Sequence, residues 1–326
     1  MSRDVDRDVD RVVVTGRIPD AGLQILRDVA EVWAWDGDEP VPDDVRDREL
    51  ATADAAVTLL TDRVDERFLA AAPNLRVVAN VAVGHNNIDV PACRARGVEV
   101  TNTPDVLTDA TADLAMGLVL MCTRRLGEGE RLIRSGEPWK WGMFMMLGSG
   151  IQGRQLGIVG MGAIGEALAV RARAFGMSIV YHNRRPVPPE TEARLGARAV
   201  GLDELLESSD VVSLNCPYTE ATHHLIDQEA LGRMKSSAYL VNTARGPIVD
   251  EAALVDALRD GRIAGAGLDV FEHEPDVHPG LLHLDNVVLI PHLGSATIET
   301  RSAMASLAAR NVVEVLAGRP AVTPVG

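Results

Sequence analysis

Leu156-Gly-Ile-Val-Gly-Met-Gly-Ala-Ile-Gly165 is the stretch that decides the fold of this chain. Four mostly apolar residues precede Gly160, Gly162 and Gly165, and a sequence typical of a helix follows. Gly160 permits a tight turn, Gly162 lets the backbone approach a pyrophosphate, and Gly165 lets helix and strand pack closely. The helix N-terminus adds unpaired N–H groups and a positive dipole that favour an anion. A second strand-like run, Met177–His182, completes the βαβ context in which this glycine spacing indicates a dinucleotide site.

The end of that second strand indicates which dinucleotide is bound. A cofactor with a free ribose 2′-hydroxyl usually meets an acidic residue about 20 residues past the first glycine. Here Asn183, Arg184 and Arg185 occupy that place, and the first acid is Glu190. Guanidiniums offer forked donors to a 2′-phosphate, whereas a carboxylate would repel it. We therefore expect NADP; the alternative is that the two arginines are a solvated pair after a strand.

Length and composition limit the class of protein. The chain has 326 residues, which favours two domains, and 46% hydrophobic residues, which allows each a core. A net charge of −15 argues against a nucleic acid or an anionic membrane surface as partner. Cys93, Cys122 and Cys216 are unclustered, so we expect reduced thiols, no metal site and a cytoplasmic location. Residues 1–10 have no apolar signal core and are expected to form a disordered tail.

Strand-like and helix-like runs alternate along the rest of the chain. This alternation predicts an α/β fold of two Rossmann-like, doubly wound parallel-sheet domains with an active-site cleft between them. A first, substrate-binding domain is expected at 11–103 plus 299–326, and a dinucleotide-binding domain at 104–298. Strands are expected at 12–15, 31–35, 55–60, 75–80, 98–101, 156–159, 177–182, 197–200, 211–215, 238–243, 264–270 and 286–290. Helices are expected at 19–29, 65–71, 90–96, 106–126, 166–175, 202–207, 228–234, 251–260 and 295–316.

The segment from Trp139 to Gly148 has too many large apolar residues for a free loop. Something should cover it, and a partner subunit is the natural candidate, so we expect a homodimer. Packing onto its own domain is the alternative.

Three ionisable residues follow expected strands of the second domain, where ligands of parallel sheets bind. They are Arg245, Glu274 and His292. Beside a nicotinamide, Arg245 would grip a 2-oxo acid in forked fashion, and His292 would be the general acid that protonates the new alkoxide. Glu274 would orient the imidazole and favour its charged form. Taken singly, each residue could also be an ordinary turn residue. Gly84, after an expected strand of the first domain, could likewise hold a carboxylate through backbone N–H groups or simply form a turn.

Four motifs occur in an order and spacing that resemble the D-isomer-specific 2-hydroxyacid dehydrogenase family. They are the glycine stretch, Leu240-Val-Asn-Thr-Ala-Arg-Gly246, Asp269-Val-Phe-Glu-His-Glu-Pro275 and Pro291-His-Leu-Gly-Ser295. The chain is most similar to the glyoxylate/hydroxypyruvate reductase branch over nearly all of its length. The resemblance implies that Arg245, Glu274 and His292 are catalytic.

The resemblance also implies further site residues. Val83 and Gly84 would hold the substrate carboxylate through N–H groups, Asp269 would bind the nicotinamide carboxamide, and a Trp of the dimer mate, Trp139 or Trp141, would reach the substrate pocket. The full set of expected cofactor-binding residues is Thr111, Gly160, Met161, Gly162, Ala163, Ile164, Gly165, Asn183, Arg184, Arg185, Cys216, Pro217, Thr222, Thr243, Ala244, Asp269 and His292. The expected substrate-binding residues are Leu60, Val83, Gly84, Arg245 and His292.

These observations predict NADPH-dependent reduction of glyoxylate or hydroxypyruvate to a D-2-hydroxy acid. One alternative is another 2-oxo acid, such as pyruvate, a bulkier oxo acid or 3-phosphohydroxypyruvate. Another is a non-catalytic, dinucleotide-sensing protein like the corepressors that share the fold. Formate dehydrogenases of the superfamily carry Gln where Glu274 stands, which argues against that reaction.

Overall fold

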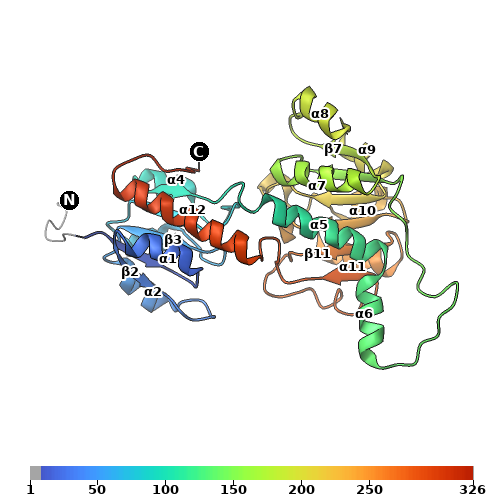
Figure 1. Cartoon of the computed structure of the whole chain (residues 1–326), viewed down its shortest axis with the longest axis horizontal. Helices are drawn as coiled ribbons and strands as arrows, with labels where there is room; N and C mark the ends of the chain where they lie inside the picture. The colour runs from blue at the N-terminus through green and yellow to red at the C-terminus, as the bar shows by residue number, and fades with distance from the viewer. Residues whose placement is uncertain (1–8, 326) are drawn as a thin grey trace. The chain divides into compact units, whose positions relative to one another are not determined.

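The computed structural model describes residues 9–325 and shows two compact units. Unit 1 contains the residues up to Leu107 together with those from Ala296 onward, and unit 2 runs from Thr108 to Ser295. Residues 1–8 of the expected tail lie outside the described residues. Each unit is a parallel sheet with helices on both faces, which confirms the expected fold class of two doubly wound α/β domains (Figure 1).

Unit 1 is built on a five-stranded parallel sheet of order β2-β1-β3-β4-β5. The three inner strands are short runs rich in Val and Ala that are buried on both faces, whereas the edge strand β2 is only half-buried. The strands are β1 (Arg11–Val14), β2 (Glu31–Ala34), β3 (Ala55–Thr58), β4 (Val77–Asn80) and β5 (Glu99–Thr101).

Helices cover both faces of this sheet. On one face α1 (Asp20–Arg27) and the C-terminal α12 (Ile298–Leu316) pack against alternate valines and alanines of the strands. The other face is covered by α2 (Asp43–Leu50), α3 (Glu66–Ala71) and α4 (Val90–Ala95). Gly22 of α1 lies so close to α12 that an added Cβ would come within 2.7 Å of the Ala305 carbonyl oxygen.

Unit 2 contains a seven-stranded parallel sheet of order β12-β11-β10-β9-β6-β7-β8. The chain winds outward from β6 in one direction and then, from β9, in the other. The winding direction therefore reverses between β6 and β9, and doubly wound sheets bind ligands at the carboxyl ends of the strands at such a switch point. The strands are β6 (Gln155–Val159), β7 (Ser178–His182), β8 (Ala197–Ala199), β9 (Val211–Leu214), β10 (Tyr239–Asn242), β11 (Gly265–Leu268) and β12 (Val287–Leu289).

Two hydrophobic cores lie on the two faces of this sheet. One contains residues of α5 (Thr108–Thr123) and α7 (Ala163–Ala174), and the other contains residues of α9 (Leu202–Ser208), α10 (Gln228–Arg233) and α11 (Glu251–Arg259). Short 3₁₀ turns, η1 (Glu220–Thr222) and η2 (Gly246–Ile248), follow β9 and β10.

Two expected helices have different bounds in the structure, and three observed helices were not expected. The helix expected at 106–126 ends at Thr123, because Arg125 takes a left-handed conformation (φ 55°), and a separate helix, α6 (Leu126–Ser135), follows. The sequence analysis also missed α2, whose polar run carries no apolar period, and the seven-residue α8 (Pro189–Leu195). The last helix begins at Ile298 rather than 295, because Thr297 caps it by accepting the Thr300 N–H.

Candidate functional site

The glycine stretch forms a strand, a tight turn and a helix start. Gly160 has φ 99° and lies against the chain after β9, where an added Cβ would come within 2.5 Å of the Cys216 backbone nitrogen. Gly162 is the N-cap of α7, and no side chain caps this helix. A Cβ built on Gly162 would meet no atom within 4 Å, whereas one on Gly165 would come within 2.5 Å of the Gly160 carbonyl oxygen. The turn therefore leaves open space before an uncapped helix N-terminus, which fits a pyrophosphate.

The side chain of Asn183 holds this turn. Its Oδ1 accepts the Met161 N–H at 2.6 Å, and its Nδ2 donates to the Met161 carbonyl at 3.2 Å. Both polar atoms of the Asn183 amide are therefore bonded to the backbone of the turn. The expected direct contact of Asn183 with a 2′-phosphate stays a prediction. Arg184 and Arg185 are exposed, and within residues 9–325 neither forms an ion pair or a side-chain hydrogen bond. Both guanidiniums are thus available to an anion.

Two buried polar atoms near the switch point have no partner in the described chain. They are Oγ1 of Thr243, just after β10, and Oδ1 of Asn215, just after β9. Buried polar groups without partners are rare in proteins, so each is suited to a bound ligand. Thr243 was an expected cofactor residue; Asn215 was missed, although its place directly after a buried strand was a usable signal.

Other expected cofactor residues are hydrogen-bonded within unit 2. Thr111 of α5 donates to the Gly294 carbonyl at 3.1 Å. Thr222 of η1 donates to the Pro217 carbonyl at 2.9 Å and accepts the Thr219 N–H at 2.8 Å. These threonines fix two loops at the carboxyl edge of the sheet, and their contact with a cofactor stays a prediction.

His292 and Glu274 form a hydrogen-bonded pair. Nδ1 of His292 lies 2.9 Å from Oε2 of Glu274, and Oε1 of Glu274 accepts the Phe271 N–H at 3.0 Å. Desolvation works to raise the pKa of Glu274, but the hydrogen bond and charge of His292 outweigh it, so the net pKa is lowered. Nε2 of His292 has no partner among the described residues, and the imidazole is one-third exposed. That nitrogen can exchange a proton with a ligand.

The backbone at His292 is held in a strained conformation. Its φ is 51°, in the left-handed region that costs a non-glycine residue roughly 1 kcal/mol or more. The buried Asp269 maintains this turn: its carbonyl accepts the His292 N–H at 2.8 Å, and its carboxylate accepts the N–H groups of Leu293 at 2.5 Å and Gly294 at 2.9 Å. Burial nevertheless raises the pKa of the Asp269 carboxyl. Asp269 therefore positions the imidazole, and its expected contact with nicotinamide stays a prediction.

Arg245 follows β10, next to the Glu274 segment. Burial lowers the pKa of its guanidinium and the nearby Glu274 charge opposes this, although an arginine stays protonated throughout. An added Cβ on Gly246 would overlap the Phe271 carbonyl group, so the two loops are in direct backbone contact. Expected catalytic residues thus gather at one edge of unit 2, where a guanidinium, a carboxylate and an imidazole could bind and protonate a carbonyl compound.

The expected substrate residues Leu60, Val83 and Gly84 belong to unit 1, where they follow β3 and β4 and are half-buried. Sequence reasoning also missed Glu251, at the start of α11, whose Oε1 accepts the Glu272 N–H at 2.8 Å and supports the Glu274 segment. Burial raises the pKa of this carboxyl. An acidic residue in the first turn of a helix is ordinary, so the sequence held no signal for this role. No group of three or more His, Cys, Asp or Glu residues in 9–325 could hold a metal ion.

Comparison with known proteins gives consistent results. Residues 116–294 match the model of the family described as D-isomer specific 2-hydroxyacid dehydrogenase, NAD binding domain. A glyoxylate reductase of Thermococcus onnurineus is 50% identical over 308 residues, which cover 93% of this chain and 92% of that protein. A protein of known structure from Thermus thermophilus is 44% identical, with a TM-score of 0.91 over 97% of this chain and 100% of that one.

A further solved structure contains a cofactor. It is an NADPH-dependent glyoxylate/hydroxypyruvate reductase from Sinorhizobium meliloti in complex with NADP and malonate. It is 36% identical to this chain, with a TM-score of 0.83, covering 98% of this chain and 97% of that one.

Proposed function

Because the chain belongs to the D-isomer specific 2-hydroxyacid dehydrogenase family, we propose that it reduces glyoxylate and hydroxypyruvate to D-2-hydroxy acids with NADPH as cofactor. The observation that supports this most is the imidazole of His292, with one nitrogen bonded to Glu274 and the other available to a ligand. The similarity to a glyoxylate reductase and to an NADPH-dependent glyoxylate/hydroxypyruvate reductase supports the choice of substrate.

The proposed chemistry divides among three side chains. Arg245 binds the carboxylate and carbonyl oxygens of a 2-oxo acid through its forked donors. When bound, a reduced nicotinamide supplies the hydride equivalent that the carbonyl carbon accepts. His292 holds a proton on Nε2 and gives it to the carbonyl oxygen as negative charge develops there. Glu274 keeps the ring oriented through Nδ1 and stabilises its charged form.

The choice of NADP rests on the residues after β7. Arg184 and Arg185 are exposed guanidiniums without described partners, and no carboxylate follows until Glu190. The pyrophosphate would lie over the open turn at Gly162, and the orphan hydroxyl of Thr243 offers a further polar contact. An NAD-dependent enzyme would place an acidic residue where Asn183 stands.

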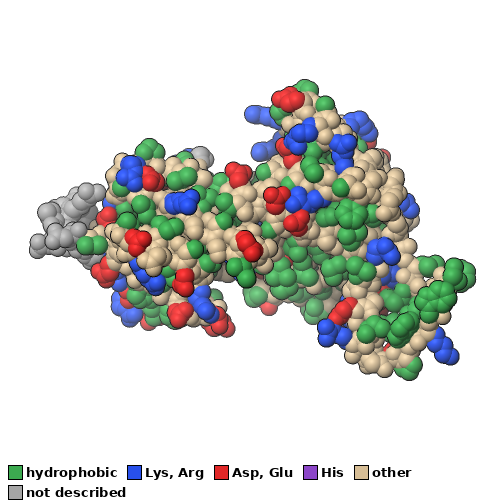
Figure 2. All heavy atoms as spheres, viewed as in Figure 1, with side chains coloured by type: hydrophobic (Ala, Val, Ile, Leu, Met, Phe, Trp, Pro, Cys, Tyr) green, Lys and Arg blue, Asp and Glu red, His purple; other side chains and the backbone are tan. Residues whose placement is uncertain are grey.

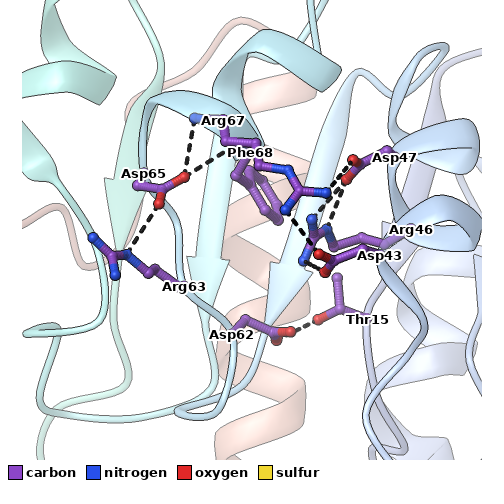
Figure 3. A network of polar contacts seen from close by, with 9 residues as sticks. All are labelled: Thr15, Asp43, Arg46, Asp47, Asp62, Arg63, Asp65, Arg67 and Phe68. Carbon is purple, nitrogen blue, oxygen red and sulfur yellow. Dashed lines mark hydrogen bonds and ion pairs between the residues drawn. The ribbon is translucent and has the colours of Figure 1, made fainter.

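One feature of unit 1 disfavours 3-phosphohydroxypyruvate as substrate. Its phosphate would need free cations near Leu60, but the guanidiniums around that loop are paired with carboxylates (Figure 3). Arg63 lies 3.0 Å from Asp65, and Arg46 and Arg67 bind the carboxylates of α2. A small, unphosphorylated oxo acid fits this surface better.

We also propose that the protein is a homodimer. Large side chains of α6 and the following loop are exposed, among them Ile133, Trp141 (77%), Phe144 (88%) and Leu147 (60%). Figure 2 shows hydrophobic side chains gathered over α6 and the loop that follows it. Soluble monomers rarely expose so contiguous an apolar surface, and a second copy of the chain would cover it. Whether Trp139 or Trp141 reaches a partner's site stays a prediction, as does a cytoplasmic location.

Oxidation of NADPH with a panel of 2-oxo acids tests the proposal. Glyoxylate and hydroxypyruvate should give the highest kcat/KM, and the same panel with NADH should be slower. A preference for pyruvate, for bulky oxo acids or for NADH would contradict it, and the absence of turnover with every acid would favour the dinucleotide-sensing alternative. Sedimentation of the wild type and of Phe144→Ser tests the dimer.

A further inference from the structure

The turn after β4 has its carbonyl groups bound by asparagines. Nδ2 of Asn102 donates to the Val83 carbonyl at 2.8 Å, and Nδ2 of Asn80 donates to the Gly84 carbonyl at 3.0 Å. In a trans peptide the N–H of the next residue points away from the carbonyl. These bonds therefore direct the N–H groups of Gly84 and His85 away from the two asparagines.

Those N–H groups have no acceptor within the described chain. Backbone N–H groups of Val83, Gly84 and His85 form no hydrogen bond in residues 9–325, although their neighbours Val81 and Ile88 do. Successive free N–H groups in a turn can converge on an anion, and residues 81–83 form such a bend directly after β4. Within unit 1 these N–H groups are the donors left for an anion, because the guanidiniums of Arg46, Arg63 and Arg67 are paired with carboxylates.

Asn80 continues this arrangement to a second loop. Its Nδ2 lies 3.3 Å from Oδ1 of Asn87, and Nδ2 of Asn87 lies 3.4 Å from Oδ1 of Asn80, so the two amides pair reciprocally. Asn87 then donates to the carbonyls of Leu59 at 3.1 Å and Asp62 at 2.9 Å. Asn80 is fully buried, and its Oδ1 also accepts the Thr58 hydroxyl at 3.2 Å.

The loop after β3 is fixed from its other side by the Asp62 carboxylate. Its Oδ2 accepts the Leu59 N–H at 2.7 Å and the Thr15 hydroxyl at 2.6 Å, the latter drawn in Figure 3. Leu60, the expected substrate residue, lies between these fixed ends. The asparagine pair thus sets the position of the Leu60 loop relative to the free N–H groups of the neighbouring turn.

We propose that Asn80 and Asn87 are positioning residues for substrate: they aim the N–H groups of Gly84 and His85 at the carboxylate of a small monocarboxylic acid and hold the Leu60 loop beside it. This inference deepens the proposed function, on which its kinetic part rests. An aspartate at position 87 has the same shape but no donor, so it would repel the carbonyls of Leu59 and Asp62 and loosen the turn. The cost of losing such a half-buried donor corresponds to about tenfold to a hundredfold in affinity.

The experiment compares the wild type with Asn87→Asp and with the control Asn74→Asp, which makes the same amide-to-carboxylate change on an exposed side chain of unit 1. Backbone-amide NMR shifts of Gly84 and His85 are followed during titration with oxamate, a carboxylate that is not reduced. Steady-state KM for glyoxylate and the dissociation constant of NADPH, from its fluorescence, are measured alongside. Asn87→Asp should weaken oxamate binding and raise KM by about tenfold to a hundredfold, with kcat and NADPH affinity little changed.

Three results would overturn the inference: unchanged oxamate affinity in Asn87→Asp, an equal loss in Asn74→Asp, or oxamate binding without movement of the Gly84 and His85 amides. If Asn87→Asp does not fold by circular dichroism, Asn87→Ser removes the donor without adding charge and takes its place. If the wild type reduces no 2-oxo acid while oxamate still moves these amides, the proposed function fails and the carboxylate site stands.

Discussion

Unit 1 and unit 2 share one architecture, yet the side chains at the carboxyl ends of their strands have different partners. In unit 2 the strand ends carry charged groups, and Nε2 of His292 has no hydrogen-bond partner among residues 9–325. In unit 1 the strand ends carry amides, and Asn80, Asn87 and Asn102 are all bonded to backbone carbonyls. The edge of unit 2 therefore presents reactive side chains, whereas the edge of unit 1 presents backbone groups that asparagines hold in place. A shared fold thus does not determine what a site can do.

Removing the imidazole of His292 is expected to have the largest effect, because it takes away the proposed general acid of unit 2. His292→Ala should lower kcat by roughly 10²–10⁴-fold, the range for a lost general acid. NADPH affinity, measured by fluorescence, should fall much less than kcat. His283→Ala, an exposed histidine of the same unit, is the control and should be active. Full turnover in His292→Ala would move the chemistry away from this edge.

The second change tests whether geometry or charge matters at the same edge. Arg245→Lys keeps the positive charge but loses the forked donors, so kcat/KM should fall by roughly 10–100-fold, as expected for a lost bond to a charged group. Steady-state kinetics with glyoxylate measure the effect. Arg259→Lys, on the exposed side of α11, is the matched control. Equal losses in both variants would contradict a specific grip by Arg245.

The third change sharpens the contrast within unit 2, between catalysis and cofactor choice. Arg184→Ser combined with Arg185→Ser should raise the dissociation constant of NADPH by roughly 10–100-fold and leave that of NADH nearly unchanged. Arg198→Ser, on β8, serves as the control because its guanidinium binds Glu204. If NADPH and NADH affinities fall together, the two arginines do not recognise a 2′-phosphate.

The smallest expected effect is on the pH dependence of folding stability, and it involves one carboxylate in each unit. Burial raises the pKa of Asp62, so the folded state holds the Asp62 proton more tightly than the unfolded state does. The stability that this proton contributes is fully present below the usual Asp pKa and is lost as the pH rises through the raised pKa. Despite the opposing effect of burial, His292 lowers the pKa of Glu274. The stability that the ionised Glu274 carboxylate contributes is present above the usual Glu pKa and is lost only as the pH falls through the lowered pKa. Between about pH 3 and pH 7, Asp62→Asn should therefore gain stability relative to the wild type as the pH rises.

Glu274→Gln should show the opposite trend and lose stability relative to the wild type over the same pH range. Urea unfolding at a series of pH values measures both differences. Parallel slopes in the two variants would contradict the assignment of opposite environments to these carboxylates.

The sequence predicted the features that depend on local pattern. Strands of the parallel sheets appear as runs of Val and Ala, and the glycine stretch specifies its own turn, so both were predictable. Helix α2 was not, because a polar surface helix has no apolar period. The roles of Asn80, Asn87 and Asn183 depend on carbonyls that lie near them only in the folded chain, and an Asn after a strand is a common turn residue. Expected catalytic residues were recognisable because several charged groups followed strands of one sheet.

The return of the chain to unit 1 affects how this protein is made. Helix α12 supplies Ala305, Ala308, Ala309 and Val312 to the core over β1, β3 and β4, so the part of this face that α1 does not cover stays exposed until α12 has left the ribosome. Unit 2, which is continuous in sequence, can finish folding earlier. Throughout synthesis the N-terminal segment therefore exposes an apolar surface, and we expect a chain truncated before residue 298 to aggregate or to need a chaperone.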